Sequence, residues 1–407
     1  MPHHPDRASD SASAPPPGGA QFFGNQTFGD QIFGDRLARL AAAAGTAGVH
    51  AVVISPGADL RYFAGHSVSS HERLTALVVP VVGQPQMVVP ALERLGWTDS
   101  PVERLGIGFT TWIDGTDPYG SLAALLGPDA KVLAVDDHMP AVHVLSIEHA
   151  VSGSRLTLAG AIIGNLRMRK EPAEVAALAE VGAAIDRVQA RIGEWLRVGR
   201  TEAEVAVDIA SALVEEGHTG ADFVIVGSGV NGASPHHEAS SKVIESGDPV
   251  VIDIGGPNAA GYYSDCTRTY RMAGDSGPIS PKITDLAEFS EVYEIVRRAQ
   301  QAGIDAVRPG VPAEAVDRAA RQVIAEEGFG EYFITRTGHG IGLEVHEHPY
   351  LVSGNTMPLE EGMAFSIEPG IYLPGRFGVR IEDIVVVTSD GALLMNNAPK
   401  TLTVVGG

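Results

Sequence analysis

The sequence predicts an α+β protein of two domains behind a disordered tail. The chain has 407 residues, which is long enough to build two hydrophobic cores. In its first third, short strand-like runs alternate with helical or turn-rich stretches, a pattern typical of an α/β layer. Further along, long amphipathic helices are separated by apolar segments that are predicted strands. We therefore expect a tail over 1–30, an α/β domain over 31–162, and a larger α+β domain over 163–407 in which helices cover the outer face of a curved sheet.

The predicted tail and the first domain differ in composition. Through Gly19 the chain is rich in Ser, Ala, Pro and Gly, which bury too little apolar surface to order a segment. A helix over 35–44 is then expected to begin the first domain. Its predicted strands are the apolar, β-branched runs at 49–54, 74–79, 86–89 and 131–135.

The larger domain is expected to begin with a helix from Pro172, because proline is favoured in the first turn and Glu174 adds acidity there. Apolar residues recur along this helix at helical spacing and form one buried stripe: Val175, Leu178, Val181, Ile185 and Val188. Thr201 and Glu204 have the spacing of a capping box. Further helices are therefore expected at 201–216, 283–307 and 312–327, with glycines at 217 and 328 as stops.

Charge and composition exclude several classes of function. The formal net charge of −21 argues against nucleic acid as a partner, because phosphate binding needs clustered Lys and Arg. No run approaches the roughly 20 apolar residues of a membrane span. A single cysteine excludes an internal disulfide framework, and no export signal precedes the first domain. We therefore expect a cytoplasmic enzyme that binds neither nucleic acid nor membrane.

Five acidic and imidazole side chains in the larger domain carry the functional signal: Asp253, Asp265, His339, Glu368 and Glu382. Asp253 and Glu368 interrupt apolar runs, and Glu382 directly precedes another one. A carboxylate on such a strand is taken out of water, and a buried charge must be paired or must coordinate a metal. One imidazole does not neutralise four carboxylates, so a polycation is the simplest partner.

The spacing of these residues is compatible with one metal site. Asp253 and Asp265 lie on two runs joined by a turn signal, so a hairpin would bring them to one side of a sheet. His339 is flanked by glycines, which let the backbone approach the imidazole closely. Oxygen-rich sites with one imidazole suit Mn²⁺, Co²⁺, Fe²⁺ or Zn²⁺. Two such ions can clamp a nucleophilic water and polarise a carbonyl or phosphoryl oxygen.

With these residues identified, the chain resembles the methionine aminopeptidase/creatinase superfamily, the "pita-bread" metallopeptidases, which carry Asp, Asp, His, Glu and Glu in this order. The resemblance is to the Xaa-Pro branch, prolidase and aminopeptidase P. It covers about 165–400 and is carried by the segments 166–174, 231–237, 338–347, 366–372 and 379–383. It implies a pita-bread catalytic domain behind a smaller creatinase-like α/β domain.

The resemblance also implies roles for individual residues. Asp253 would bind one metal, His339 and Glu368 the other, and Asp265 and Glu382 would bridge the two ions, with Mn²⁺ foremost. A hydroxide bridging the metals would attack the scissile carbonyl carbon, and Glu368 would shuttle its proton to the departing proline nitrogen. Substrate would be contacted by His236 and His346, and Arg380 would hold carboxylate ligands from behind.

Several other positions are weaker candidates for a functional role. Relatives of this branch usually carry a His four positions before the ligand His, where this chain has Thr335. The resemblance implies that this difference alters the proline pocket or the catalytic rate but not the metal site. His237 is a candidate second substrate contact, although a structural role is favoured. His66 and His71 lie in a stretch that approaches a neighbouring subunit in the family. Cys266 is expected to be a small buried hydrophobe, and Asp383 to point away from the ligands on the opposite strand face.

The predicted function is therefore hydrolysis of the Xaa-Pro bond in dipeptides or short peptides by a homodimeric enzyme with two divalent ions. One alternative is a non-peptidase enzyme on the same fold, such as an ectoine-type amide hydrolase or a sulfonium propionate lyase, and Thr335 keeps it open. Another is a silent binding protein, which the retention of all five ligands disfavours.

Overall fold

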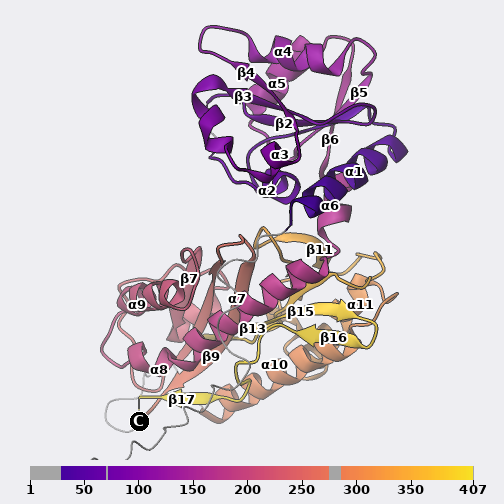
Figure 1. Cartoon of the computed structure of the whole chain (residues 1–407). Helices are drawn as coiled ribbons and strands as arrows, with labels where there is room; N and C mark the ends of the chain where they lie inside the picture. The colour runs from indigo at the N-terminus through magenta and orange to yellow at the C-terminus, as the bar shows by residue number, and fades with distance from the viewer. Residues whose placement is uncertain (1–28, 70–71, 275–285, 407) are drawn as a thin grey trace, which may run out of the picture.

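The computed structural model describes residues 29–69, 72–274 and 286–406 and consists of two domains joined through one helix (Figure 1). The expected tail lies outside the described residues except at its end, where the first helix α1 (Asp30–Thr46) begins earlier than predicted. Asp30 forms a bidentate pair with Arg104, and this contact between remote segments explains why the helix begins at that residue.

The first domain contains a six-stranded sheet in the order β4-β3-β2-β1-β5-β6. Four of its strands were predicted, β1 (Ala51–Ile54), β2 (Ala76–Pro80), β3 (Gln86–Pro90) and β5 (Val132–Val135). The two that were missed, β4 (Gly108–Trp112) and β6 (Arg155–Leu158), are the sheet's edges. Edge strands are only partly buried, so they lack the continuous apolar run that identifies a central strand.

Short helices surround this sheet and lead into the second domain. They are α2 (Ala58–Ala64), η1 (Ala91–Trp97), α3 (Pro101–Arg104), α4 (Pro118–Leu126), α5 (Ala141–Ala150) and α6 (Gly160–Arg167). The expected boundary between 162 and 163 falls within α6. Buried side chains of both domains, such as Leu60 and Leu178, belong to one hydrophobic cluster that spans the junction.

The second domain begins with α7 (Pro172–Ala190), α8 (Ile192–Trp195) and α9 (Glu202–Glu215), where both expected start signals form capping boxes. One sheet has the order β17-β9-β8-β7 and is built from β7 (Phe223–Ser228), β8 (Pro249–Pro257), β9 (Tyr263–Met272) and β17 (Thr403–Val405). A 3₁₀ turn, η2 (Gly229–Ala233), follows β7. Helices α7 and α9 pack on this sheet, as Figure 1 shows.

The remaining strands form a second, antiparallel sheet and a hairpin. The sheet has the order β11-β10-β12-β15-β16, from β10 (Gly338–Gly340), β11 (Glu347–Leu351), β12 (Ala364–Ile367), β15 (Asp383–Thr388) and β16 (Gly391–Leu394). The hairpin pairs β13 (Gly370–Leu373) with β14 (Phe377–Arg380). Helices α10 (Leu286–Ala306) and α11 (Ala313–Glu326) pack on these strands, with η3 (Gly330–Tyr332) after them. The α+β class with antiparallel sheets and outer helices is confirmed.

Candidate metal centre and substrate cavity

The first two acidic residues lie on adjacent antiparallel strands. Asp253 on β8 pairs with Thr267 of β9, and Asp265 on β9 pairs with Gly255 of β8. Since residues two apart on a strand share a face, both carboxylates are on one side of the sheet, in diagonal rather than directly opposed positions. Both side chains are buried.

The imidazole and the third carboxylate come from the second sheet and are linked by Ser366. Its hydroxyl accepts a hydrogen bond from the His339 backbone N–H at 3.0 Å and donates one to Glu368 Oε1 at 3.0 Å. Gly338 makes this approach sterically feasible, because a Cβ there would lie 1.9 Å from the Ser366 carbonyl oxygen. His339 Nε2 consequently lies 3.1 Å from Glu368 Oε1.

Glu382 connects the two sheets at the centre of the site. It lies immediately before β15, and its backbone N–H donates to the carbonyl of Thr267 at 3.1 Å. The Thr267 hydroxyl in turn donates to Glu382 Oε2 at 2.7 Å. Ligand atoms of Asp265, His339 and Glu382 all lie within 4.8 Å of one another. Residues more than 100 positions apart therefore converge on one buried volume.

These side chains have buried acceptor atoms that a metal ion would satisfy. One carboxylate oxygen each of Asp253, Asp265 and Glu382 is buried and has no hydrogen-bond partner among the residues that the structure describes. Burial, together with the neighbouring carboxylates, raises the pKa of Asp265 and the pKa of Glu382 well above their usual ranges. Unsatisfied buried acceptors and crowded negative charge both cost free energy, and a divalent cation relieves both.

Arg380 lies behind the ligands as expected. Its Nη2 pairs with Asp253 Oδ2 at 2.6 Å, and its Nη1 donates to the Tyr372 hydroxyl at 2.8 Å and to the Pro235 carbonyl at 3.2 Å. Its Nε donates to the Thr267 hydroxyl at 3.1 Å. One guanidinium thus orients a ligand carboxylate and holds the loop that precedes His236.

The five predicted ligands line one cavity of about 670 Å³. His236, His346, Arg380 and Thr335 line the same cavity, and the ring centroids of His346 and His339 are 4.2 Å apart. Burial, together with His339 and Arg336, lowers the pKa of His346 to about 4, so this imidazole is neutral near pH 7. The Thr335 hydroxyl oxygen is buried, and no described residue forms a hydrogen bond with it.

Sequence reasoning missed several residues of the cavity wall: Asp222, Phe223, Ile225, Ile334, Arg336 and Val345. Among them, Arg336 is a cation that stacks over the ring of Tyr350 at 4.7 Å and has no carboxylate partner among the described residues. The sequence signal that could have identified Arg336 is its place next to Thr335 and three positions before His339.

Two of the weaker histidine candidates, His237 and His66, lie away from this cavity. His237 does not line it, and its Nε2 lies 2.8 Å from Glu202 Oε2 instead. Its ring thus has a structural partner, as the favoured interpretation expected. His66 packs against Trp97 in the first domain, with ring centroids 4.8 Å apart. His71 lies outside the described residues.

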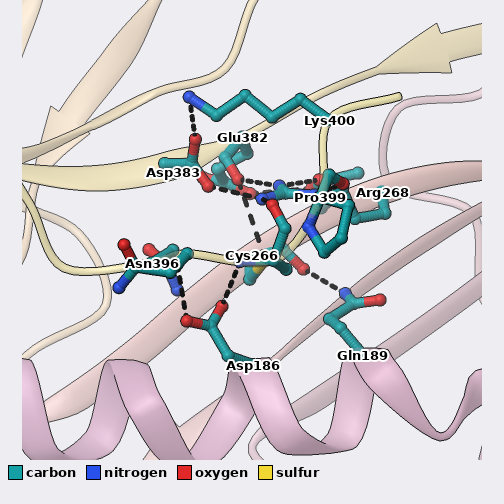
Figure 2. Close-up of polar contacts among 12 residues, drawn as sticks. Asp186, Gln189, Cys266, Arg268, Glu382, Asp383, Asn396, Pro399 and Lys400 are labelled. Carbon is teal, nitrogen blue, oxygen red and sulfur yellow. Dashed lines mark hydrogen bonds and ion pairs between the residues drawn. The ribbon is translucent and has the colours of Figure 1, made fainter. Parts of the chain in front are cut away.

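The other face of the ligand strands is a separate polar network (Figure 2). Asp383 pairs with Arg268 at 2.7 Å and with Lys400 at 2.6 Å, so it points away from the ligands as expected. Arg268 also donates to the Glu382 carbonyl at 2.6 Å. Cys266 is fully buried, which fits its expected role as a small hydrophobe. This network supports the backbone that carries Glu382.

Comparison with known proteins agrees with this geometry. Residues 176–389 match the model of metallopeptidase family M24, and residues 36–169 match that of the creatinase/prolidase N-terminal domain. The chain belongs to metallopeptidase family M24. It combines a metallopeptidase domain with a creatinase/prolidase-type N-terminal domain, and the buried acidic and imidazole cluster is its candidate metal site.

Relatives within family M24 include peptidases of known structure. The chain is 52% identical over 370 residues to the probable dipeptidase PepE of Mycobacterium tuberculosis, covering 91% of this chain and 96% of that protein. It is 36% identical to an Xaa-Pro dipeptidase of Lactobacillus helveticus, covering 86% and 94%. The crystal structure of dipeptidase PepE from Mycobacterium ulcerans matches with a TM-score of 0.87 at 53% identity, covering 93% of this chain and 100% of that one. A prolidase from Thermococcus sibiricus matches with a TM-score of 0.82 at 35% identity, covering 91% and 99%.

Within the part of the chain that the structure describes, no helix combines the length and the apolar character that crossing a bilayer requires.

Proposed function

We propose that this protein is a dipeptidase that hydrolyses the Xaa-Pro bond with two divalent metal ions. The observation that carries the proposal is the convergence of five predicted ligands on one cavity, three of them with a buried, unsatisfied carboxylate oxygen. The names of relatives support the substrate class, because an Xaa-Pro dipeptidase and a prolidase are among them.

In this proposal the ligands divide between two ions, with Mn²⁺ first and Co²⁺, Fe²⁺ or Zn²⁺ as alternatives. Asp253 would hold one ion, His339 and Glu368 the other, and Asp265 and Glu382 would bridge them. Bound ions of this kind lower the pKa of water and polarise a carbonyl oxygen. Asp253 would be kept in orientation by its pair with Arg380.

The protein's own groups would move the protons and orient the substrate. Burial opposes ionisation of Glu368, but His339, Arg380 and Ser366 hold the pKa of that carboxyl below its usual range. Glu368 is therefore ionised at neutral pH and suited to accept a proton from the attacking water and deliver it to the proline nitrogen. His236 and neutral His346 would donate hydrogen bonds to the substrate near the scissile carbonyl.

The cavity wall favours a dipeptide over a longer peptide. Arg336 lines the cavity as a cation without a carboxylate partner among the described residues, so it would pair with the free C-terminal carboxylate of a dipeptide. A cytoplasmic homodimer that acts on small peptides, and binds neither nucleic acid nor membrane, completes the proposal.

A second candidate is hydrolysis of a non-prolyl dipeptide or another small amide at the same site. Thr335 favours it, because its buried hydroxyl lacks a partner in the described part of the chain. Thr335 also lines the cavity and occupies the position where prolidase-type relatives usually carry His. A polar substrate group would satisfy this hydroxyl, whereas a proline ring would not.

The test is hydrolysis by metal-stripped protein reloaded with Mn²⁺, Co²⁺ or Zn²⁺. The panel contains Leu-Pro, the tripeptide Leu-Pro-Gly, Leu-Ala, and Leu-Pro amide as the matched substrate without a terminal carboxylate. Metal-dependent cleavage of Leu-Pro above all others supports the proposal. Preference for Leu-Ala favours the second candidate, and preference for Leu-Pro-Gly contradicts the dipeptidase assignment.

A further inference from the structure

Glu202, the first residue of α9, has a fully buried carboxylate. All of its hydrogen-bond donors come from the segment 228–240. Ser228 donates its backbone N–H and its hydroxyl, both at 2.7 Å, and Ser240 donates the same pair of groups at 3.2 and 2.7 Å. The Asn231 amide reaches both carboxylate oxygens at 3.0 and 3.1 Å, and His237 Nε2 lies at 2.8 Å.

The segment that Glu202 holds is the one that carries His236 to the cavity. On one side of His236, the Pro235 carbonyl accepts a hydrogen bond from Arg380, which also holds the ligand Asp253. On the other side, His237 is tied to Glu202. His236 is exposed between two anchored neighbours, so its direction is set by anchors on both sides rather than by packing of its own ring.

Capping of α9 does not explain this arrangement. That task belongs to Thr201 and Glu204, whose side chains form the reciprocal capping box at the same helix end. Glu202 therefore adds little to the cap, and its carboxylate instead organises a stretch that, beyond η2, has no regular secondary structure. Fixing such a loop costs conformational entropy, which a buried carboxylate with several strong hydrogen bonds can offset.

We propose that Glu202 is a positioning residue that sets the geometry of His236 at the scissile carbonyl, with His237 as the link between them. The proposal rests on the proposed function, in which His236 stabilises charge that develops in the transition state. A displacement of about 1 Å in such a group lowers the rate by up to about 100-fold. Loss of Glu202 should therefore lower kcat and leave KM nearly unchanged.

The experiment compares Glu202→Gln with Asp248→Asn as the matched control. Asp248 is also a buried carboxylate and accepts hydrogen bonds from Lys242 Nζ at 2.9 Å and from the Glu245 N–H at 3.0 Å. Lys242 Nζ also donates to the Ser228 hydroxyl at 2.8 Å, so Asp248→Asn alters the surroundings of Ser228 but leaves the contacts of Glu202 with Asn231, His237 and Ser240 in place. With Mn²⁺-loaded enzyme and Leu-Pro, Glu202→Gln is expected to lower kcat roughly 10- to 100-fold with metal content unchanged. Asp248→Asn should change kcat less than about twofold, an effect consistent with a role in stability alone.

A double-mutant cycle with His236→Ala separates positioning from general damage. If Glu202 acts through His236, adding Glu202→Gln to His236→Ala lowers kcat no further. A further loss equal to that of the single variant, or full activity of Glu202→Gln, overturns the inference. Should Glu202→Gln not fold, His237→Ala takes its place in the cycle, because it removes only the link nearest to His236.

An activity-independent readout keeps this test separate from the proposed function. In histidine-labelled protein, the NMR signal of the His236 ring should broaden or shift in Glu202→Gln and stay in place in Asp248→Asn. An unchanged His236 signal in Glu202→Gln overturns the positioning role even if wild-type enzyme does not cleave Leu-Pro. Absence of Leu-Pro cleavage with the expected NMR change would refute only the proposed substrate.

Discussion

Replacing Asp265 with Asn should stabilise the metal-free protein while removing its response to metal. Asp265 lies among buried carboxylates, and its ligand atom is within 4.8 Å of that of Glu382. Two full charges at that distance repel by about 3.5 kcal/mol at an effective dielectric constant of about 20. Because a shared proton already relieves part of this repulsion, the expected gain in the free energy of unfolding is about 1–3 kcal/mol.

The sign of the pH dependence follows from the raised pKa of Asp265, caused by burial and by Glu382 and Asp253. In the unfolded chain this carboxyl ionises near pH ~4, whereas in the metal-free fold it resists ionisation. Its protonated form therefore gives full stability below pH ~4, and stability is lost as pH rises. The difference in melting temperature between Asp265→Asn and wild type should be absent near pH 4 and grow toward neutrality.

The matched control is Asp383→Asn, which removes the same charge from β15, next to Glu382 but directed away from the candidate metal site. Asp383 is paired with Arg268 and Lys400, so its loss leaves Arg268 buried without its carboxylate. We expect a loss of about 3–5 kcal/mol. Scanning calorimetry in EDTA and with added Mn²⁺ measures all three proteins. The reasoning is refuted if Asp265→Asn melts below wild type in EDTA, or if Mn²⁺ raises its melting temperature as much as it raises that of wild type.

Four further predictions concern the cavity and its support. Thr335→His should raise kcat/KM for Leu-Pro; a decrease would indicate a pocket adapted to another substrate. Arg336→Leu should raise KM for Leu-Pro about 10-fold or more, by loss of a charged hydrogen bond, and leave Leu-Pro amide unaffected in the same assay. Gly338→Ala should lower the melting temperature and the Mn²⁺ affinity measured by calorimetry, because a Cβ would lie 1.9 Å from a carbonyl oxygen. Gly96→Ala serves as its control, because a Cβ there would meet nothing within 4 Å. Burial opposes ionisation of Glu202, but its hydroxyl, amide and imidazole donors lower its pKa. The stability that ionised Glu202 contributes above pH ~4.5 should therefore disappear on acidification. Melting temperatures of wild type and Glu202→Gln should accordingly converge in acid.

The candidate metal ligands were predictable because each stands in a local context that conflicts with a solvated charge. Asp253 and Glu368 adjoin apolar strands, which in a sheet are buried. His339 lies between two glycines that close backbone approaches require, of Ser366 to Gly338 and of His348 to Gly340. Such conflicts between residue type and local pattern are expected at functional sites.

Arg336 and Glu202 were not predictable in the same way. In the sequence, Arg336 cannot be told from an ordinary half-exposed arginine. Only the fold places it in the cavity wall, where it has no carboxylate partner among the described residues. Glu202 follows a helix cap, where an acidic residue is ordinary, and its role depends on four donor residues in a segment 26 to 38 positions away. Neither arrangement leaves a periodic or local trace in the sequence.

By itself, the sequence determined the α+β class, the two-domain order, the central strands and helices, and the set of side chains able to hold metal. These follow from local propensity, from hydrophobic periodicity and from the cost of burying a charge. Only the tertiary structure decided which carboxylates share a volume, that Glu202 is the partner of His237, and that Arg268 and Lys400 are the partners of Asp383. Those outcomes depend on contacts between residues far apart in the chain, and such contacts exist only once the sheets and helices have packed.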